Sequence, residues 1–295
     1  MASVNPLEIT TAQGLQGLET LIAEVDKLVS LPDIYYRLEE AIVDPASTTD
    51  KIAELLRSDP DLCARMLRMA NSVFYSFPTR IETVERAVSV IGLRQIRELV
   101  LITSVVRAFE GIPDELVNMS TFWEHSVAVG IMAQALGKQA RIANAGNFYI
   151  PGLLHDIGRL VMYLKLPGLT HQLLLEREAT ACSIFQLERN LLGYSHTEIG
   201  ARLLESWKLP QSIWEPVATH HKPASSGEFA SAACAIHIAD CWVNTNRAGS
   251  TGSCYLLEMD QDALQLIGID IAELHQIGLE AAGQTQEIVR QFMAH

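Results

Sequence analysis

Residues 152–162 read GLLHDIGRLVM and combine a helical pattern of apolar side chains with an adjacent histidine and aspartate. Apolar side chains spaced three and four residues apart form one face of an α-helix. We therefore predict a helix over residues 149–165, with His155 and Asp156 inside it. The same segment thus indicates a helical fold and supplies two residues of a candidate site.

The rest of the chain repeats this helical pattern, and no stretch alternates as a strand would. Ser195 and Glu198 have the spacing of a capping box just before an apolar run, and Ser120 is the predicted cap of a helix through His125 to about Gln139. The run Gly111-Ile112-Pro113 is the best candidate boundary between two parts. We predict an all-α fold. Further helices are predicted over 82–91, 94–109, 167–192 as a pair, 210–221, 228–246 and from 260 onward.

Composition and charge narrow the classes of function. Apolar residues make up 48% of the chain and charged residues 19%, which is typical of a globular protein, and the formal net charge is -13. Such an acidic chain is a poor partner for nucleic acids or anionic membranes, and no apolar run is long enough to span a membrane. The five cysteines are widely spaced with no CxxC pair, and no signal peptide is visible, so we expect a reduced, cytoplasmic setting.

Histidine and aspartate side chains recur at helical positions along the second half of the chain. Imidazole with carboxylate is the ligand set of Fe, Mn, Zn or Ni rather than of calcium. Because the set is too large for one ion, we predict two divalent transition-metal ions that share Asp156 as a bridge. The first ion would take His125, His155 and Asp240, and the second His196, His220 and His221.

Charged residues around this set suggest further roles. Arg159 lies one helical turn after His155, where it could contact an anion bound at the metals. His237 lies three residues before Asp240, and we interpret it as a partner of the ligands or as a hydrogen-bonded core residue. A local excess of basic residues over 51–107 predicts either a face for a phosphorylated or acidic partner or, as the favoured alternative, a solvated surface with local ion pairs. Its members are Arg57, Arg65, Arg68, Arg94 and Arg97.

Several separated motifs resemble a known family. GLLHDIGRLVM (152–162), HTEIGARLLESWKLP (196–210) and HIADCW (237–242) look like the HD superfamily of metal-dependent phosphohydrolases. Upstream, LVSLPDIYYRLEEAIVDP (28–45), SDPDLCARMLRMANSVFY (58–75) and TVERAVSVIGLRQIRELVLITSVV (83–106) are similar to HDOD, the HD-related output domain of bacterial signalling proteins. The resemblance covers about residues 20–245 and implies two packed helical subdomains, the second an HD-type bundle, with a role in signal transduction.

On this basis we divide the chain into an N-terminal extension (1–19), an N-terminal helical subdomain (20–112), an HD-like metal-binding subdomain (113–248) and C-terminal helices packed on the HD-like part (249–295). HDOD members often lose metal ligands, whereas all seven positions here carry a residue that can bind metal. The related HD-GYP phosphodiesterases carry a GYP signature after the paired histidines, but residues 222–231 read KPASSGEFAS. Those enzymes also carry a lysine shortly after their adjacent histidine and aspartate, and this chain has Arg159 at that position.

Two functions follow from these observations. The favoured one is a regulatory module that contacts a protein partner in a signalling pathway, with a phosphorylated or nucleotide ligand as a further candidate. The alternative is a metal-dependent phosphohydrolase acting on a phosphomonoester or a cyclic (di)nucleotide. Its catalytic residues would be Asp156 and Arg159, with a metal-bound hydroxide as nucleophile and Arg159 stabilising charge on phosphorus.

Overall fold

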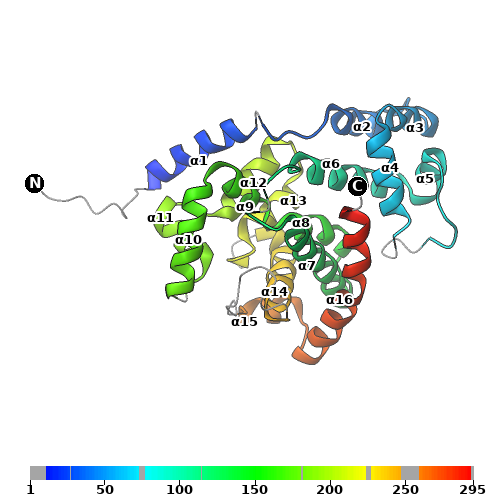
Figure 1. The fold of residues 1–295 in the computed structure, drawn as a ribbon. Coiled ribbons are helices and arrows are strands. Elements are labelled where there is room, and N and C mark those ends of the chain that lie inside the picture. The colour runs from blue at the N-terminus through cyan, green and yellow to red at the C-terminus, as the bar shows by residue number, and fades with distance from the viewer. Residues whose placement is uncertain are drawn as a thin grey trace, which may run out of the picture. The chain divides into compact units, whose positions relative to one another are not determined.

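The structure is a computed structural model that describes residues 11–26, 28–72, 77–113, 115–180, 182–223, 227–246 and 259–293. Every regular element within these ranges is a helix, which confirms the predicted all-α class (Figure 1). None of the described helices is both long and apolar enough to cross a membrane. Residues 1–10 of the predicted extension, and 249–258 of the predicted C-terminal part, lie outside the described residues.

The chain divides into two compact units. One comprises the described residues of 29–111 and 283–295, and the other those of 1–28 and 112–282. Helix α1 (Thr11–Val25) packs against helices α9 and α12 of the second unit. The four predicted sequence ranges differ from this division in where they place α1 and the last residues, and their boundaries stay a prediction.

The unit of residues 29–111 is a small helical bundle. Its helices are α2 (Asp33–Val43), α3 (Thr49–Arg57), α4 (Pro60–Ala70), α5 (Val84–Ile91) and α6 (Leu93–Ala108). Leu38, Leu56, Met66 and Leu99 are fully buried in its core. Proline is well placed at the first position of α4, since its missing N–H would have had no helical partner.

The unit of residues 112–282 holds all the predicted metal ligands. Its elements are α7 (Met119–Gln139), η1 (Ala145–Phe148), α8 (Tyr149–Leu154), α9 (Ile157–Lys165), α10 (Pro167–Thr180), α11 (Ile184–Leu192), α12 (His196–Ser206), α13 (Gln211–Thr219), η3 (Gly227–Phe229), α14 (Ala230–Asn246) and α15 (Gln261–Ile267), and α16 (Ile271–Met293) begins in it. Helix α7 packs against α8 and α14, and α12 packs against α9 and α13. A β-carbon on Gly152 would lie 2.8 Å from the Cα of Gly130, so glycine allows α7 and α8 to approach closely.

Two sequence predictions about helix ends are wrong. The helix predicted over 149–165 is interrupted at His155 and Asp156, between α8 and α9. The ring of His155 donates from Nδ1 to the carbonyl of Gly152 (2.8 Å), and such a local side-chain bond competes with the helical ladder. In α7, Asn118 rather than Ser120 is the cap, because its Oδ1 accepts the N–H of Thr121 (2.9 Å).

The candidate metal centre

The interruption between α8 and α9 places the HD motif, which is His155 followed by Asp156, at a helix junction. Asp156 has φ -100° and ψ 9°, outside helical values, and stands immediately before α9. The other candidate ligands also lie at or near the ends of helices or on the buried faces of long ones. His125 is on α7, His196 begins α12, His220 and His221 follow α13, and Asp240 is on α14.

The structure brings all seven predicted ligands together, although they come from a stretch of more than a hundred residues. In the first group, Nε2 of His125 lies 3.1 Å and Nε2 of His155 lies 3.6 Å from Oδ1 of Asp240. The two Nε2 atoms are 3.4 Å apart. All three side chains are buried. Their nearest ligand atoms lie within 4.8 Å of one another, so one ion could reach all three.

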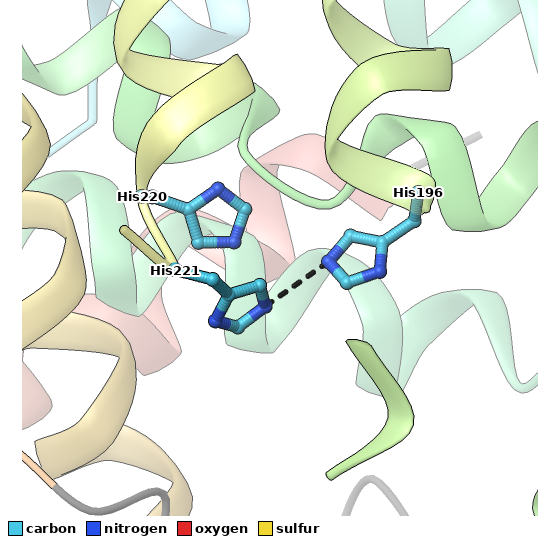
Figure 2. Close-up of side chains that lie close together, drawn as sticks. All are labelled: His196, His220 and His221. Atoms are coloured by element: carbon cyan, nitrogen blue, oxygen red, sulfur yellow. Dashed lines mark hydrogen bonds between the residues drawn. The ribbon is translucent and has the colours of Figure 1, made fainter. Parts of the chain in front are cut away.

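The second group consists of His196, His220 and His221. Figure 2 shows the three rings converging, with the ring of His196 entering from the start of α12 and the other two from the segment after α13. Nε2 of His221 lies 3.2 Å from Nε2 of His196. This group also has its nearest ligand atoms within 4.8 Å of one another. These two groups have the same members as the two predicted ligand sets, and a third group of His155, Asp156 and His220 shares residues with both.

Asp156 lies between the two groups. Its Oδ2 is 3.5 Å from Nε2 of His155, which belongs to the first group. Its Oδ1 is 3.3 Å from Nε2 of His196, which belongs to the second group. A carboxylate with one oxygen toward each group has the geometry that a bridge between two ions needs.

Hydrogen bonds at Nδ1 decide which ring nitrogen each histidine presents to the centre. His155 donates from Nδ1 to the carbonyl of Gly152, and His220 donates from Nδ1 to the carbonyl of Val217 (2.9 Å). A carbonyl can only accept, so the proton resides on Nδ1 and Nε2 keeps its lone pair. The buried Nε2 of His220 has no hydrogen-bond partner among the described residues. An acceptor nitrogen that is buried without a donor fits a metal ligand.

The electrostatics of the centre favour neutral rings at His220 and His221 and ionised carboxylates, whereas the carboxylates raise the pKa of His155. Burial, together with the neighbouring His155 and His196, lowers the pKa of His220 to about 3. Burial alone would raise the pKa of Asp156, but Arg159 and the surrounding histidines hold it well below its usual range. Neutral imidazole and ionised carboxylate are the protonation states that bind metal.

Arg159 and a cavity lie beside the centre. Nε of Arg159 is 3.2 Å from Oδ1 of Asp156. The cavity has a volume of about 230 Å³ and reaches the two predicted ligands His125 and Asp156. One part of its wall is apolar, from Leu116, Val117, Phe122 and Leu174, and another is polar, from Arg159, Tyr163, Glu178 and Asn244. The position of Arg159 would allow it to contact an anion held at the centre.

Sequence reasoning missed two residues that hold the ligands in place. Glu188, on α11, accepts a hydrogen bond from Nδ1 of His196 (2.5 Å), and no motif or spacing in the sequence indicates this contact. Asn244 donates to Oδ1 of Asp240 (2.7 Å) from one helical turn further along α14, and this spacing could have been noticed. His237 donates from Nδ1 to the carbonyl of His220 (2.9 Å) and accepts from a backbone N–H. It is therefore a hydrogen-bonded core residue that supports a ligand.

Several arginines of residues 51–107 form local ion pairs. Arg57 pairs with Glu85, and Arg97 approaches Glu39 (3.6 Å). Arg65 contacts both Asp61 and Glu110. These pairs agree with the favoured alternative of a solvated surface with local ion pairs.

The described helices gather histidine and aspartate into a buried cluster that could hold metal, since helical bundles build metal sites from side chains on facing helices. The chain belongs to the HDOD domain family, whose family model matches residues 28–223. Asp240 lies beyond the matched residues.

Three proteins from the comparisons are similar to this chain. A protein of Geobacter sulfurreducens, an HDOD domain protein with unknown function, is 25% identical, with a TM-score of 0.73 over 95% of this chain and 100% of that one. A protein of Shewanella amazonensis SB2B named "Putative phosphohydrolase" is 26% identical, with a TM-score of 0.72 over 92% of this chain and 97% of that one. An uncharacterized protein of Treponema pallidum is 27% identical over 219 residues, which are 73% of this chain and 41% of that protein.

Proposed function

We propose that the chain is a signalling output module whose HD-like unit holds two divalent transition-metal ions and binds a phosphorylated or nucleotide ligand beside them. The observation that carries this proposal is the position of Asp156, with one carboxylate oxygen toward His155 and the other toward His196. Membership of the HDOD family supports the signalling role. Contact with a protein partner is part of the same proposal.

The charge of the centre supports an anionic ligand. Two divalent ions contribute four positive charges, and the carboxylates of Asp156 and Asp240 contribute two negative ones, so the loaded centre would carry a net charge of +2. Such ions neutralise charge on a phosphate and acidify a bound water molecule. Arg159 would add a guanidinium donor on the side of the cavity.

The size of the cavity limits the ligand. Its volume of about 230 Å³ is below the roughly 300–1,000 Å³ of sites that enclose drug-sized molecules. We therefore favour a phosphomonoester of modest size over a cyclic dinucleotide. Arg57, Arg65 and Arg97 are paired with carboxylates in their own unit, so we place the phosphorylated ligand at the centre rather than on that face.

Phosphoester hydrolysis is the second candidate function. The observation that favours it is that the cavity reaches Asp156 and Arg159, the two predicted catalytic residues. In this function Asp156 would orient the ions, and Arg159 would donate hydrogen bonds to the phosphate oxygens where negative charge develops. The name of the Shewanella amazonensis neighbour is consistent with such chemistry.

One experiment separates the two functions. The protein is loaded with Mn²⁺, Fe²⁺ or Zn²⁺ and mixed with a panel of phosphomonoesters and cyclic dinucleotides, beside Asp156→Ala. Calorimetry measures binding, and release of inorganic phosphate or of the opened dinucleotide measures turnover. Turnover that the variant lacks supports the hydrolase, and binding without turnover supports the output module. A loaded protein that neither binds nor converts any compound of the panel would contradict both.

A further inference from the structure

Helix α11 contributes a buried carboxylate that contacts a candidate ligand from outside the cluster. Glu188 is only 1% exposed, although it carries an ionisable group. Its Oε2 lies 2.5 Å from Nδ1 of His196 and 2.9 Å from the backbone nitrogen of the same residue. Buried acidic side chains are rare unless their hydrogen bonds and charge have partners. The two contacts with His196 provide such partners for Glu188.

The two hydrogen bonds act on different parts of His196. The backbone N–H of this residue is among the first of α12 and has no acceptor within its own helix, so Glu188 supplies one. The same oxygen accepts the ring proton on Nδ1. The proton is thereby held on Nδ1, and Nε2 presents its lone pair toward Asp156 and His221.

Neighbouring groups hold Glu188 itself in place. Arg159 and Arg177 line a small cavity together with Glu188, and they provide positive charge close to its carboxylate. Glu188 in turn is one of the carboxylates that raise the pKa of Arg159, against the lowering effect of burial. From the same helix, Phe185 lies edge-on to the ring of His196, with centroids 6.4 Å apart. Helix α11 therefore fixes both the orientation and the proton of this imidazole.

We infer that Glu188 is a positioning residue that sets the tautomer and orientation of His196 and so raises the affinity of the second ligand group for metal. This inference rests on the proposed metal centre. A carboxylate that accepts the second ring N–H of a metal-bound histidine makes the ring a stronger donor, and loss of such a partner weakens metal binding about 10–100-fold. Glu188 touches neither the ions nor the ligand of the centre.

The chain offers a matched control on α12, the helix that His196 begins. Glu198 also stabilises the start of α12, because its Oε2 accepts the backbone N–H of Ser195 (2.9 Å), and it pairs with Arg189. Within the described part of the chain, its hydrogen bonds go to Ser195 and Arg189 and not to the ring of His196. Loss of Glu198 therefore perturbs the helix start without releasing the imidazole.

The test compares Glu188→Gln, Glu188→Ala and Glu198→Gln with the wild type. Zinc affinity is measured by competition with a chelator, and the tautomer of His196 is measured by ¹⁵N NMR in the metal-free protein. We expect affinity to fall about tenfold or more in Glu188→Ala and less in Glu188→Gln, whose amide oxygen can still accept the ring proton. Glu198→Gln should bind zinc within about twofold of the wild type. In Glu188→Ala the ring should become a mixture of tautomers, and in Glu188→Gln the Nδ1–H form should persist.

Wild-type zinc affinity and an unchanged tautomer in Glu188→Ala would overturn the inference, as would an equal loss of affinity in Glu198→Gln. If Glu188→Ala does not fold, the affinity of Glu188→Gln decides, and a value equal to wild type overturns it. A wild-type protein that binds no zinc, Mn²⁺ or Fe²⁺ would contradict the proposed function instead, while the tautomer of the metal-free protein would still test the role of Glu188.

Discussion

Gly158 lies directly against the main chain of His196, so close that a β-carbon at this position would clash with the carbonyl oxygen of His196. Gly158 is the second residue of α9, and His196 is the first of α12. This approach of two helix starts holds the HD motif beside the second group of candidate ligands. The 3.3 Å separation between Asp156 and His196 depends on it.

Gly158→Ala should therefore separate α9 from α12. Overpacking of a close backbone contact costs about 1–3 kcal/mol, and the displacement would also move His196 away from Asp156. We expect a lower free energy of unfolding in urea, together with weaker zinc binding. Gly168→Ala is the control, because a β-carbon there meets no atom within 4 Å, and it should be neutral or stabilising by up to about 1 kcal/mol. Equal stability of the two variants would contradict the close approach.

Asp156→Asn should abolish the stabilisation that metal gives. Metal that binds the folded state adds about 2.7 kcal/mol of stability when its free concentration is a hundred times the dissociation constant. We expect zinc to raise the melting temperature of the wild type and of Asp262→Asn, an exposed control on α15, but not that of Asp156→Asn. The same rise in all three proteins would count against Asp156 as a shared ligand.

The metal-free protein should lose stability in mild acid. The pKa of His220 is lowered to about 3 and that of His221 lies well below its usual value, chiefly because both rings are buried. In the unfolded chain both titrate near 6.5. Between about pH 6.5 and 3 the unfolded chain binds more protons than the folded one. The stabilisation is thus complete above about 6.5, and the folding constant falls by up to about tenfold per pH unit for each ring as pH drops.

His155 contributes with the opposite sign. Burial lowers its pKa, but Asp156, Asp240 and the hydrogen bond to Gly152 together outweigh burial, and the net shift is upward. Its stabilisation is therefore complete below about 6.5 and is lost as pH rises. Urea unfolding of the metal-free protein at pH 7, 6 and 5 measures the free energy of unfolding, which sums the opposite effects of His155 and of the pair His220 and His221. We expect stability to decrease toward pH 5, and His220→Asn to show a shallower decrease. Stability that is constant or increases toward pH 5 would show that the rings are not held neutral.

Arg159→Ala should weaken phosphate binding more than it lowers metal content. A hydrogen bond to a charged group contributes about 1.5–3 kcal/mol, so the dissociation constant for inorganic phosphate should rise at least tenfold in the loaded protein. The dissociation constant of Arg159→Lys should lie between those of the wild type and Arg159→Ala, since lysine keeps the charge but lacks the planar guanidinium group. Arg202→Ala, at an exposed ion pair on α12, is the control. Phosphate affinity that is equal in all four proteins would remove Arg159 from the site.

Much of this architecture could be predicted from the sequence because it depends on local patterns. The spacing of apolar side chains indicates the helices, and the capping box at Ser195 and Glu198 is present where the sequence predicts it. The ordered histidines and aspartates indicate the composition of the cluster, and the structure gathers them. The spacing of apolar residues is enough to predict the fold class, and the types of the polar residues are enough to predict the members of the cluster.

The rest could not be predicted because it depends on contacts between distant segments or on competition between local bonds. The break at His155 arises when its ring takes the carbonyl of Gly152 from the helical ladder, which periodicity does not reveal. The contact of Glu188 with His196 depends on the turn that reverses the chain between α11 and α12. The pairing of Arg65 with Glu110 joins residues 45 positions apart.

The number of metal ions per chain decides whether the centre is dinuclear. The protein is purified without added metal, and its Fe, Mn, Zn and Ni contents are measured by elemental analysis beside those of Asp156→Ala. We predict close to two ions per chain in the wild type and a marked loss in the variant, because one carboxylate serves both ligand groups. A wild-type protein that stays free of these metals even after incubation with them, or a variant with the same content, would contradict this prediction.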